Sequence, residues 1–433
     1  MHPIKKIIEG NDDIQKGICS VCSASDFVIE AMLVKAWETN AIALIEATAN
    51  QVNQFGGYTG MRPADFAARV FDIADKIGIA REQVVLGGDH LGPYPWRNED
   101  ESSAMEKAKD LVGEFVKAGF TKIHIDTSMR LGDDTGDILK DEVIASRALR
   151  LAESAQNSKL ADKEYVFVLG SEVPVPGGTV GDESLKVTEP EVFKKTYEYY
   201  KDSFLKNGMD EIWKDVIAFV VQPGVEFGET SVEYYDRENA RALCNTLKNY
   251  PGIVFEGHST DYQPARKLKE MVDDGIKILK VGPALTFYQR EVLFALEMVE
   301  KELAGGSKAQ LSNFSGILED EMLKDPSDWK NYYHGNENQL KLMRRYGLSD
   351  RCRYYLTKEP VVLSVKRLIS NLDKIKIPYS VLSQYMPIQA ALVNSGDLSP
   401  NARSLIRSRI TDCLNDYMIA TGVDEIIEFP VKI

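Results

Sequence analysis

Two histidines stand at the ends of apolar runs, and each has carboxyl groups close to it in the sequence. Asp89 and His90 follow the run 84–88, and His258 lies between Glu256 and Asp261. The chain has only 5 histidines, so two of them at such positions are a notable concentration. Catalytic divalent-metal sites typically bind the ion through imidazoles and a carboxylate and leave one coordination position of the ion open. The pattern predicts a divalent-metal site, with zinc as the expected ion.

Other polar residues occupy similar positions. Glu172, Gln222 and Lys280 each lie at or near the end of a further apolar run. His124 lies inside a run and is interpreted as a hydrogen-bonded core residue, whereas Asp126 behind it could reach the same place as His90. Taken alone, an Asp, Glu or His is more often a structural group than a ligand. Their common position at the ends of runs is what favours a site.

The elements that must position these residues are eight short apolar runs, each followed by a stretch with helical periodicity. The runs are 17–23, 41–48, 84–90, 122–128, 165–173, 216–224, 252–261 and 278–285, and the helical stretches are 26–38, 63–77, 102–119, 141–156, 190–206, 235–248, 264–274 and 287–303. Continuous apolar runs are typical of strands buried on both faces. Eight strand-helix units predict an α/β fold, a (β/α)8 TIM barrel, with the polar run ends gathered at one mouth.

Past residue 304 the sequence shows helical periods and no convincing strands. We therefore expect a barrel over 1–305 and a helical C-terminal extension over 306–433 that packs on the barrel or closes over its mouth. In barrels of this kind the loops after the last two strands often bind phosphate. Here those loops contain Ser259 and Thr260, and Gly282 and Pro283. The tail segment 349–354 could add an arginine, although a surface salt bridge is the alternative interpretation.

Composition excludes several classes of partner. The net charge of -14 disfavours nucleic acid and an anionic membrane surface. No stretch is apolar enough to span a bilayer, and the N-terminus is too polar for a signal peptide, so we expect a cytoplasmic protein. The 5 scattered cysteines do not form a disulfide framework. Cys19 and Cys22 form a C-x-x-C inside the first run, where a structural or barrel-lining role is favoured.

At these same residues the chain resembles a known family. The segments GICSVCSA, IEATANQVNQFGGYTGM, LGGDHLGP, SEVPVPGG, VVQPGVEF, EGHSTDYQ and LKVGPALTF are similar to the non-catalytic, Z-type subunit of class II D-tagatose-1,6-bisphosphate aldolase, the GatZ/KbaZ family. That family is distantly similar to the zinc-dependent class II aldolases. The resemblance implies that Asp89 is the acid/base and that His90 and His258 are metal ligands. A further ligand histidine of those aldolases is absent, because this chain reads Val221-Gln222-Pro223 there.

The residues expected to act follow from these considerations. Gln222 could bind the metal through its amide oxygen, and Glu172 could move a proton or supply a carboxylate. The loop 50–58 is either a substrate-binding loop or a turn-rich connection. The expected catalytic residues are Asp89, Glu172 and Lys280; the expected substrate-binding residues are Asn53, Gln54, Ser259, Thr260, Asp261 and Gly282; and the expected metal ligands are His90, His258 and Gln222.

Two functions remain open at this point. The resemblance implies an accessory subunit that supports the activity and stability of a catalytic aldolase chain of the GatY/KbaY type in tagatose metabolism. The alternative is an enzyme in its own right, a metal-dependent C4 epimerase that interconverts the tagatose and fructose forms of a ketohexose or its phosphate. Retro-aldol cleavage explains such an activity, because the C4 hydrogen of a 2-ketose is not acidic. A homo-oligomer is compatible with either function.

Overall fold

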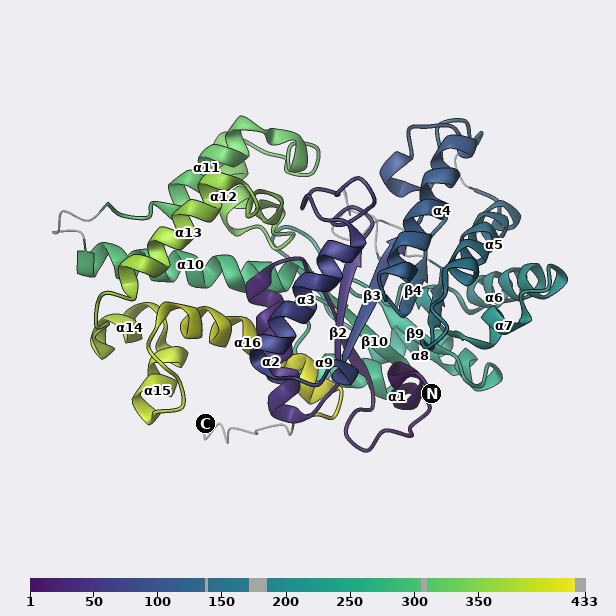
Figure 1. The fold of residues 1–433 in the computed structure, drawn as a ribbon, viewed down its shortest axis with the longest axis horizontal. Helices are drawn as coiled ribbons and strands as arrows, with labels where there is room; N and C mark the ends of the chain where they lie inside the picture. The colour runs from purple at the N-terminus through teal and green to yellow at the C-terminus, as the bar shows by residue number, and fades with distance from the viewer. Residues whose placement is uncertain (137–138, 171–184, 305–309, 425–433) are drawn as a thin grey trace.

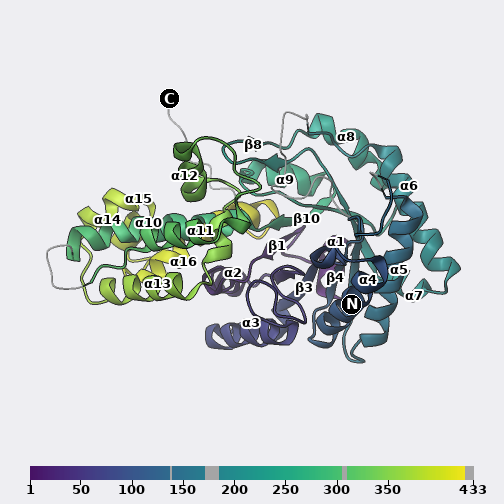
Figure 2. The same ribbon diagram turned by 90° about the horizontal axis from the view of Figure 1, so that it is seen from above.

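The computed structural model describes residues 1–136, 139–170, 185–304 and 310–424. Eight parallel strands close into a barrel in the order β1-β10-β9-β6-β5-β4-β3-β2, with helices around it (Figures 1 and 2). Each predicted run supplies one strand, so the predicted TIM barrel is confirmed. The strands are β1 (Ile18–Cys22), β2 (Ala43–Thr48), β3 (Val84–Leu91), β4 (Lys122–Ile125), β5 (Val166–Leu169), β6 (Val216–Val221), β9 (Val254–Gly257) and β10 (Ile276–Val281).

A helix follows each barrel strand at nearly the predicted position. Pro63 and Pro190 each occupy the first turn of a helix, where a missing N–H costs nothing. The last of these helices begins four residues before the predicted start, at Pro283. The helices are α2 (Asp26–Thr39), α3 (Pro63–Ile77), α4 (Glu101–Lys117), α5 (Asp141–Ser158), α6 (Pro190–Lys206), α8 (Arg237–Thr246), α9 (Ala265–Asp273) and α10 (Pro283–Ala304).

Three elements of the barrel were not predicted. Helix α1 (Pro3–Ile8) buries Ile4, Ile7 and Ile8 against the first residues of the barrel strands, among them Ile18 and Val166, and so closes the amino-terminal end of the barrel. A short helix α7 (Asp210–Lys214) precedes β6. A hairpin of β7 (Glu226–Phe227) and β8 (Val232–Glu233) follows β6. The apolar residues of α1 are hidden among charged ones in the sequence, which is why the helix was missed.

The chain beyond residue 310 is helical, as predicted, throughout its described part. Figure 1 shows these helices gathered along α10, while α16 returns to the barrel. There α16 packs against α9 and α2, and Tyr417 Oη donates a hydrogen bond to the Thr260 carbonyl oxygen over 2.8 Å. The helices are α11 (Phe314–Lys324), α12 (Glu337–Tyr346), α13 (Glu359–Leu372), α14 (Tyr379–Tyr385), α15 (Pro387–Ser395) and α16 (Ala402–Ala420). None of the described helices combines the length and apolarity that crossing a membrane requires.

Candidate functional site

A pocket of about 210 Å³ opens at the carboxyl ends of the barrel strands. The predicted residues Asp89, His90, His258 and Lys280 all line it, and they come from β3, β10 and the loop that follows β9. The strand ends therefore meet at one mouth, as a parallel barrel requires. The C-terminal extension completes the wall with Arg353 and Tyr354, which belong to a 3-10 turn at Arg351–Tyr355.

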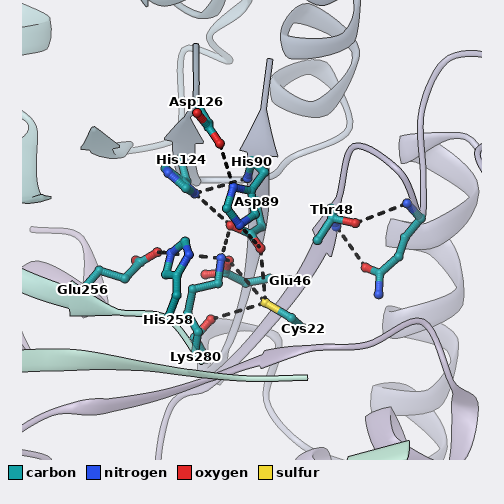
Figure 3. A network of polar contacts seen from close by, with 12 residues as sticks. Cys22, Glu46, Thr48, Asp89, His90, His124, Asp126, Glu256, His258 and Lys280 are labelled. Carbon is teal, nitrogen blue, oxygen red and sulfur yellow. Dashed lines mark hydrogen bonds and ion pairs between the residues drawn. The ribbon is translucent and has the colours of Figure 1, made fainter. Parts of the chain in front are cut away.

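Three imidazoles lie close together at the carboxyl ends of the strands, and two of them, His90 and His258, line the pocket (Figure 3). The ring centroids of His90 and His124 are 4.9 Å apart, those of His90 and His258 are 4.8 Å apart, and those of His124 and His258 are 5.3 Å apart. With Asp89 they form a cluster in which each residue offers one ligand atom, and these atoms lie within 4.8 Å of one another. A buried cluster that could hold a metal ion is therefore present at the predicted place.

Each of the three rings is held by a hydrogen bond to an oxygen acceptor. His90 Nδ1 lies 2.9 Å from Asp126 Oδ2, His124 Nε2 lies 2.8 Å from the Gly170 carbonyl oxygen, and His258 Nε2 lies 3.0 Å from Glu256 Oε1. In metal sites the histidine nitrogen that does not bind the metal usually donates to such an acceptor, which fixes the ring and its tautomer. The three anchors are thus those expected around a bound cation.

The protonation states also suit a cation. Burial lowers the pKa of both His124 and His258 to about 4, so both rings are neutral near pH 7. Because His124 Nε2 faces a carbonyl and Nδ1 accepts from the His90 backbone N–H over 3.2 Å, the ring proton sits on Nε2. His124 Nδ1 also lies 2.8 Å from Asp89 Oδ1, and Lys280 Nζ contacts that same oxygen. Neutral imidazoles with a carboxylate fit Zn²⁺ and similar ions.

Buried charged groups lie next to the imidazoles inside the barrel, and Figure 3 shows Glu46, Glu256 and Lys280 among them. Lys122 Nζ lies 2.6 Å from both Glu46 Oε1 and Glu256 Oε2, and Lys280 Nζ contacts Asp89 Oδ1 directly. Burial opposes ionisation of Glu46 and Glu256, but Lys122 holds the pKa of each carboxyl below its ordinary value. With Asp89 included, three carboxylates face the two ammonium groups of Lys122 and Lys280, which leaves excess negative charge to attract a cation.

Two glycines and one strained residue make this arrangement possible. A Cβ at Gly87 would lie 2.7 Å from Glu46 Cγ, and a Cβ at Gly92 would lie 1.8 Å from the Asp126 carbonyl oxygen. His90 has a φ of 46°, a left-handed conformation that costs a residue with a side chain about 1 kcal/mol. The pairing of β3 with β4 shifts register between Gly88 and Leu91. This kink turns both Asp89 and His90 toward the mouth, although they are consecutive in a strand.

Some predicted site residues form hydrogen bonds that stabilise loops and do not line the pocket. Asn53 Oδ1 accepts from the backbone N–H groups of Phe55 and Gly57, and Gln54 Nε2 donates to the Lys107 carbonyl oxygen. Thr260 Oγ1 donates to the Lys280 carbonyl oxygen. In the loop after β2 it is Thr48, Asn50, Gln51 and Tyr58 that line the pocket. The loop therefore contributes to the wall of the pocket, while Asn53 and Gln54 shape its turn.

Gln222, the predicted third ligand, is hydrogen-bonded to backbone groups of the loop that follows β6. Its amide oxygen accepts from the backbone N–H groups of Gly224 at 2.8 Å and Val225 at 3.0 Å, and the residue does not line the pocket. His124, expected to be a hydrogen-bonded core residue, belongs to the cluster that could hold a metal. It is indeed buried and hydrogen-bonded, but it faces the cluster. Glu172 lies outside the described residues.

The predicted phosphate loops have an internal partner. The Asp261 carboxylate accepts from the backbone N–H groups of Gly282 at 3.1 Å and Ala284 at 2.7 Å. It therefore caps the first turn of α10, where an external anion was expected. Asp261 and Gly282 still line the pocket, as does Ser259.

The cysteines behave as the sequence suggested. All 5 are free thiols, and Cys22 lines the pocket. Burial raises the pKa of Cys22 to about 12, so the thiol stays protonated and is a poor nucleophile. Its Sγ lies 3.5 Å from Asp89 Oδ2. A barrel-lining role therefore accounts for Cys22.

Similar proteins place the chain in a family. A solved structure from Sinorhizobium meliloti 1021, of a probable tagatose 6 phosphate kinase, is 41% identical over 93% of this chain and 100% of its own, with a TM-score of 0.87. Fructose-bisphosphate aldolase from Campylobacter jejuni is 14% identical over 83% of this chain and 88% of its own, with a TM-score of 0.41. That second likeness is too weak to support an argument. Residues 4–422 match the model of the GatZ/KbaZ-like D-tagatose-1,6-bisphosphate aldolase subunit family, and the chain belongs to this family.

Proposed function

We propose that the chain is a metal-dependent enzyme that breaks and re-forms the C3–C4 bond of a ketohexose phosphate and thereby inverts C4. The single observation that carries this proposal is the convergence of His90, His124 and His258 around Asp89 at the barrel mouth. A protein that acted only as a scaffold would gain nothing from burying such a cluster, because desolvating polar groups costs free energy.

The three imidazoles would hold the ion, and zinc is the ion that best suits nitrogen ligands with an open position. A bound divalent cation would supply a Lewis acid for the ketose oxygens and for the negative charge that develops beside C3. Gly170, Asp126 and Glu256 keep the rings aimed at this point through the hydrogen bonds described above. The remaining steps belong to side chains of this protein.

Asp89 acts as the general base. Its carboxylate removes the proton from the C4 hydroxyl, the O–H electron pair forms the C4 carbonyl, and the C3–C4 bond breaks with its electron pair left on C3 as an enediolate. The three-carbon aldehyde then turns its other face toward C3. When C3 attacks this face, the new C4 alkoxide recovers the proton from Asp89, so that atoms and charge balance over the cycle.

Lys280 supports this chemistry by electrostatics. Its ammonium group contacts Asp89 Oδ1 and lies 3.6 Å from Glu46 and 3.7 Å from Glu256, so it is surrounded by carboxylates. An ammonium held in this way stabilises negative charge at the base and beside it.

Tagatose 6-phosphate and fructose 6-phosphate are the proposed substrate pair, because they differ only at C4. The family description names a tagatose-bisphosphate aldolase subunit, and the name of the Sinorhizobium relative also contains tagatose 6 phosphate. Both names support a phosphorylated ketohexose as the substrate class.

A second candidate function is favoured by the word subunit in the family description. In that role the chain would bind a catalytic aldolase of the GatY/KbaY type and raise its activity and stability. Mixing the two purified chains and measuring aldol cleavage of tagatose 1,6-bisphosphate tests it. This role does not need Asp89, so the Asp89→Asn variant should stimulate the partner as well as the unmodified chain does.

Metal removal tests the proposed enzyme. After dialysis against a chelator, the protein should lose its conversion of tagatose 6-phosphate to fructose 6-phosphate, and added Zn²⁺ or another divalent ion should restore it. The circular dichroism spectrum should change little, because the apolar contacts between the barrel strands and the surrounding helices do not involve the ion. Undiminished conversion by protein that elemental analysis shows to be free of metal would overturn the proposal.

A further inference from the structure

We propose that Arg353 binds the phosphate group of the sugar and makes the site selective for ketose phosphates over free ketoses. The inference rests on the proposed function and adds the group that reads the end of the substrate remote from the metal site. Arg353 comes from the C-terminal extension. Among the described residues that line the mouth pocket, it is the one arginine.

Arg353 stands where two cavities meet. It lines the mouth pocket and also an adjoining cavity of about 560 Å³ between the barrel and the extension. The two cavities share Cys22, Gln51, Tyr58 and Gly282 as well. A sugar whose reacting carbons lie at the imidazoles can therefore extend toward this boundary, where its terminal group would meet the guanidinium.

The charge of Arg353 has no direct counter-ion among the described residues. Its Nη1 donates to the carbonyl oxygens of Ser349 and Asp350, and its Nη2 donates to Tyr354 Oη over 2.9 Å. All three acceptors are neutral. Burial raises the pKa of Asp261 to about 6 and Arg353 opposes this rise, but the two side chains form no ion pair. The arginine therefore keeps a charge that an anion can use.

Three other buried arginines differ from Arg353 in this respect. The buried guanidinium groups of Arg147, Arg290 and Arg344 each form an ion pair with a carboxylate, at 2.6 to 2.8 Å. At the second cavity, Arg403 pairs with Glu30 at 2.6 Å, and Arg69 pairs with Asp26. Removing a guanidinium from water without a carboxylate is unfavourable, and a bound phosphate offers the fork of a guanidinium two acceptors at once.

Phosphate binding at Arg353 is also compatible with the hydrogen bonds already made in the predicted phosphate loops. Asp261 already occupies the backbone N–H groups of Gly282 and Ala284. A phosphate at those groups would have to displace a buried carboxylate. The guanidinium lies in the same pocket and requires no such exchange. The extension, rather than the loops of the barrel, thus supplies the anion contact.

Binding to the full-length, metal-loaded protein tests the inference without depending on turnover. Titration calorimetry with tagatose 6-phosphate should show affinity that is about 10- to 100-fold weaker for Arg353→Gln, the range of a lost hydrogen-bonded charge. Affinity for unphosphorylated tagatose should stay within about twofold, since that sugar does not use the charge. Arg353→Lys, which keeps the charge but loses the fork, should give an intermediate and equally selective loss.

The matched control is Arg351→Gln on the same turn. The guanidinium of Arg351 lies over the Tyr332 ring, 3.4 Å from its centroid, and does not line the mouth pocket. This variant should bind both sugars as the unmodified chain does. Equal weakening of both sugars in Arg353→Gln, or no selective loss in Arg353→Lys, would overturn the inference and assign Arg353 to holding the turn. If the protein shows no turnover but its preference for the phosphorylated sugar still depends on Arg353, the proposed function is rejected and this inference stands.

Discussion

Replacing Asp89 with asparagine is expected to lower the interconversion of tagatose 6-phosphate and fructose 6-phosphate by about 100- to 10,000-fold, the usual contribution of a general base. Asparagine has nearly the same shape but cannot accept the C4 hydroxyl proton. Because His90, His124 and His258 remain, metal content should be close to that of the unmodified chain. Steady-state rates and elemental analysis of the same sample measure both quantities.

Asp126→Asn is the matched control. Asp126 also lines the pocket, but its Oδ2 is hydrogen-bonded to His90. Asp89, in contrast, contacts Lys280 and His124. Losing such an orienting carboxylate typically weakens metal binding about 10- to 100-fold. Excess metal should therefore rescue Asp126→Asn and leave Asp89→Asn inactive. An Asp89→Asn variant that retains more than about a tenth of the rate would remove Asp89 from the role of base.

The second large effect is expected at His124. His124→Asn should weaken metal binding by more than about 100-fold, since the loss of an orienting partner alone already costs 10- to 100-fold. Gln222→Ala should bind metal as the unmodified chain does. Competition with a metal-binding dye of known affinity measures this, and it separates the ligand set that we propose from the set that the sequence predicted.

Gln222→Ala should instead change the stability of the fold. Gln222 accepts two backbone N–H groups, so its truncation should lower the free energy of unfolding by about 1 to 3 kcal/mol, the cost of leaving buried donors unsatisfied. Urea denaturation of the metal-free proteins measures this difference. Loss of metal in Gln222→Ala together with retention in His124→Asn would reverse the assignment of the third ligand.

The barrel could be read from the sequence because its strands are continuous apolar runs and its helices have regular periods. The strand ends then placed Asp89, His90, His258 and Lys280 at one mouth. His124 was missed because it lies inside its run. One signal was present: side chains alternate along a strand, so the buried Lys122 and His124 share a face, and Ile123 and Ile125 share the other.

The positions of the loop and tail residues could not be predicted from the sequence. Whether Asn53 or Gln51 faces the pocket depends on hydrogen bonds inside one loop, which composition does not fix. Asp261 was expected to bind substrate because it follows a strand, yet it caps α10. Arg353 could be named as an arginine in the tail, but its position depends on how the extension folds back on the barrel. Such contacts are far apart in the chain and leave no local pattern.

The most direct test of the account is the action of the purified, metal-loaded chain on tagatose 6-phosphate with no other aldolase chain present. Proton and carbon NMR should show fructose 6-phosphate forming until the two sugars reach equilibrium. The same equilibrium should be approached from fructose 6-phosphate. No conversion in either direction, by protein that carries a full complement of metal at His90, His124 and His258, would contradict the claim that this chain is an enzyme by itself.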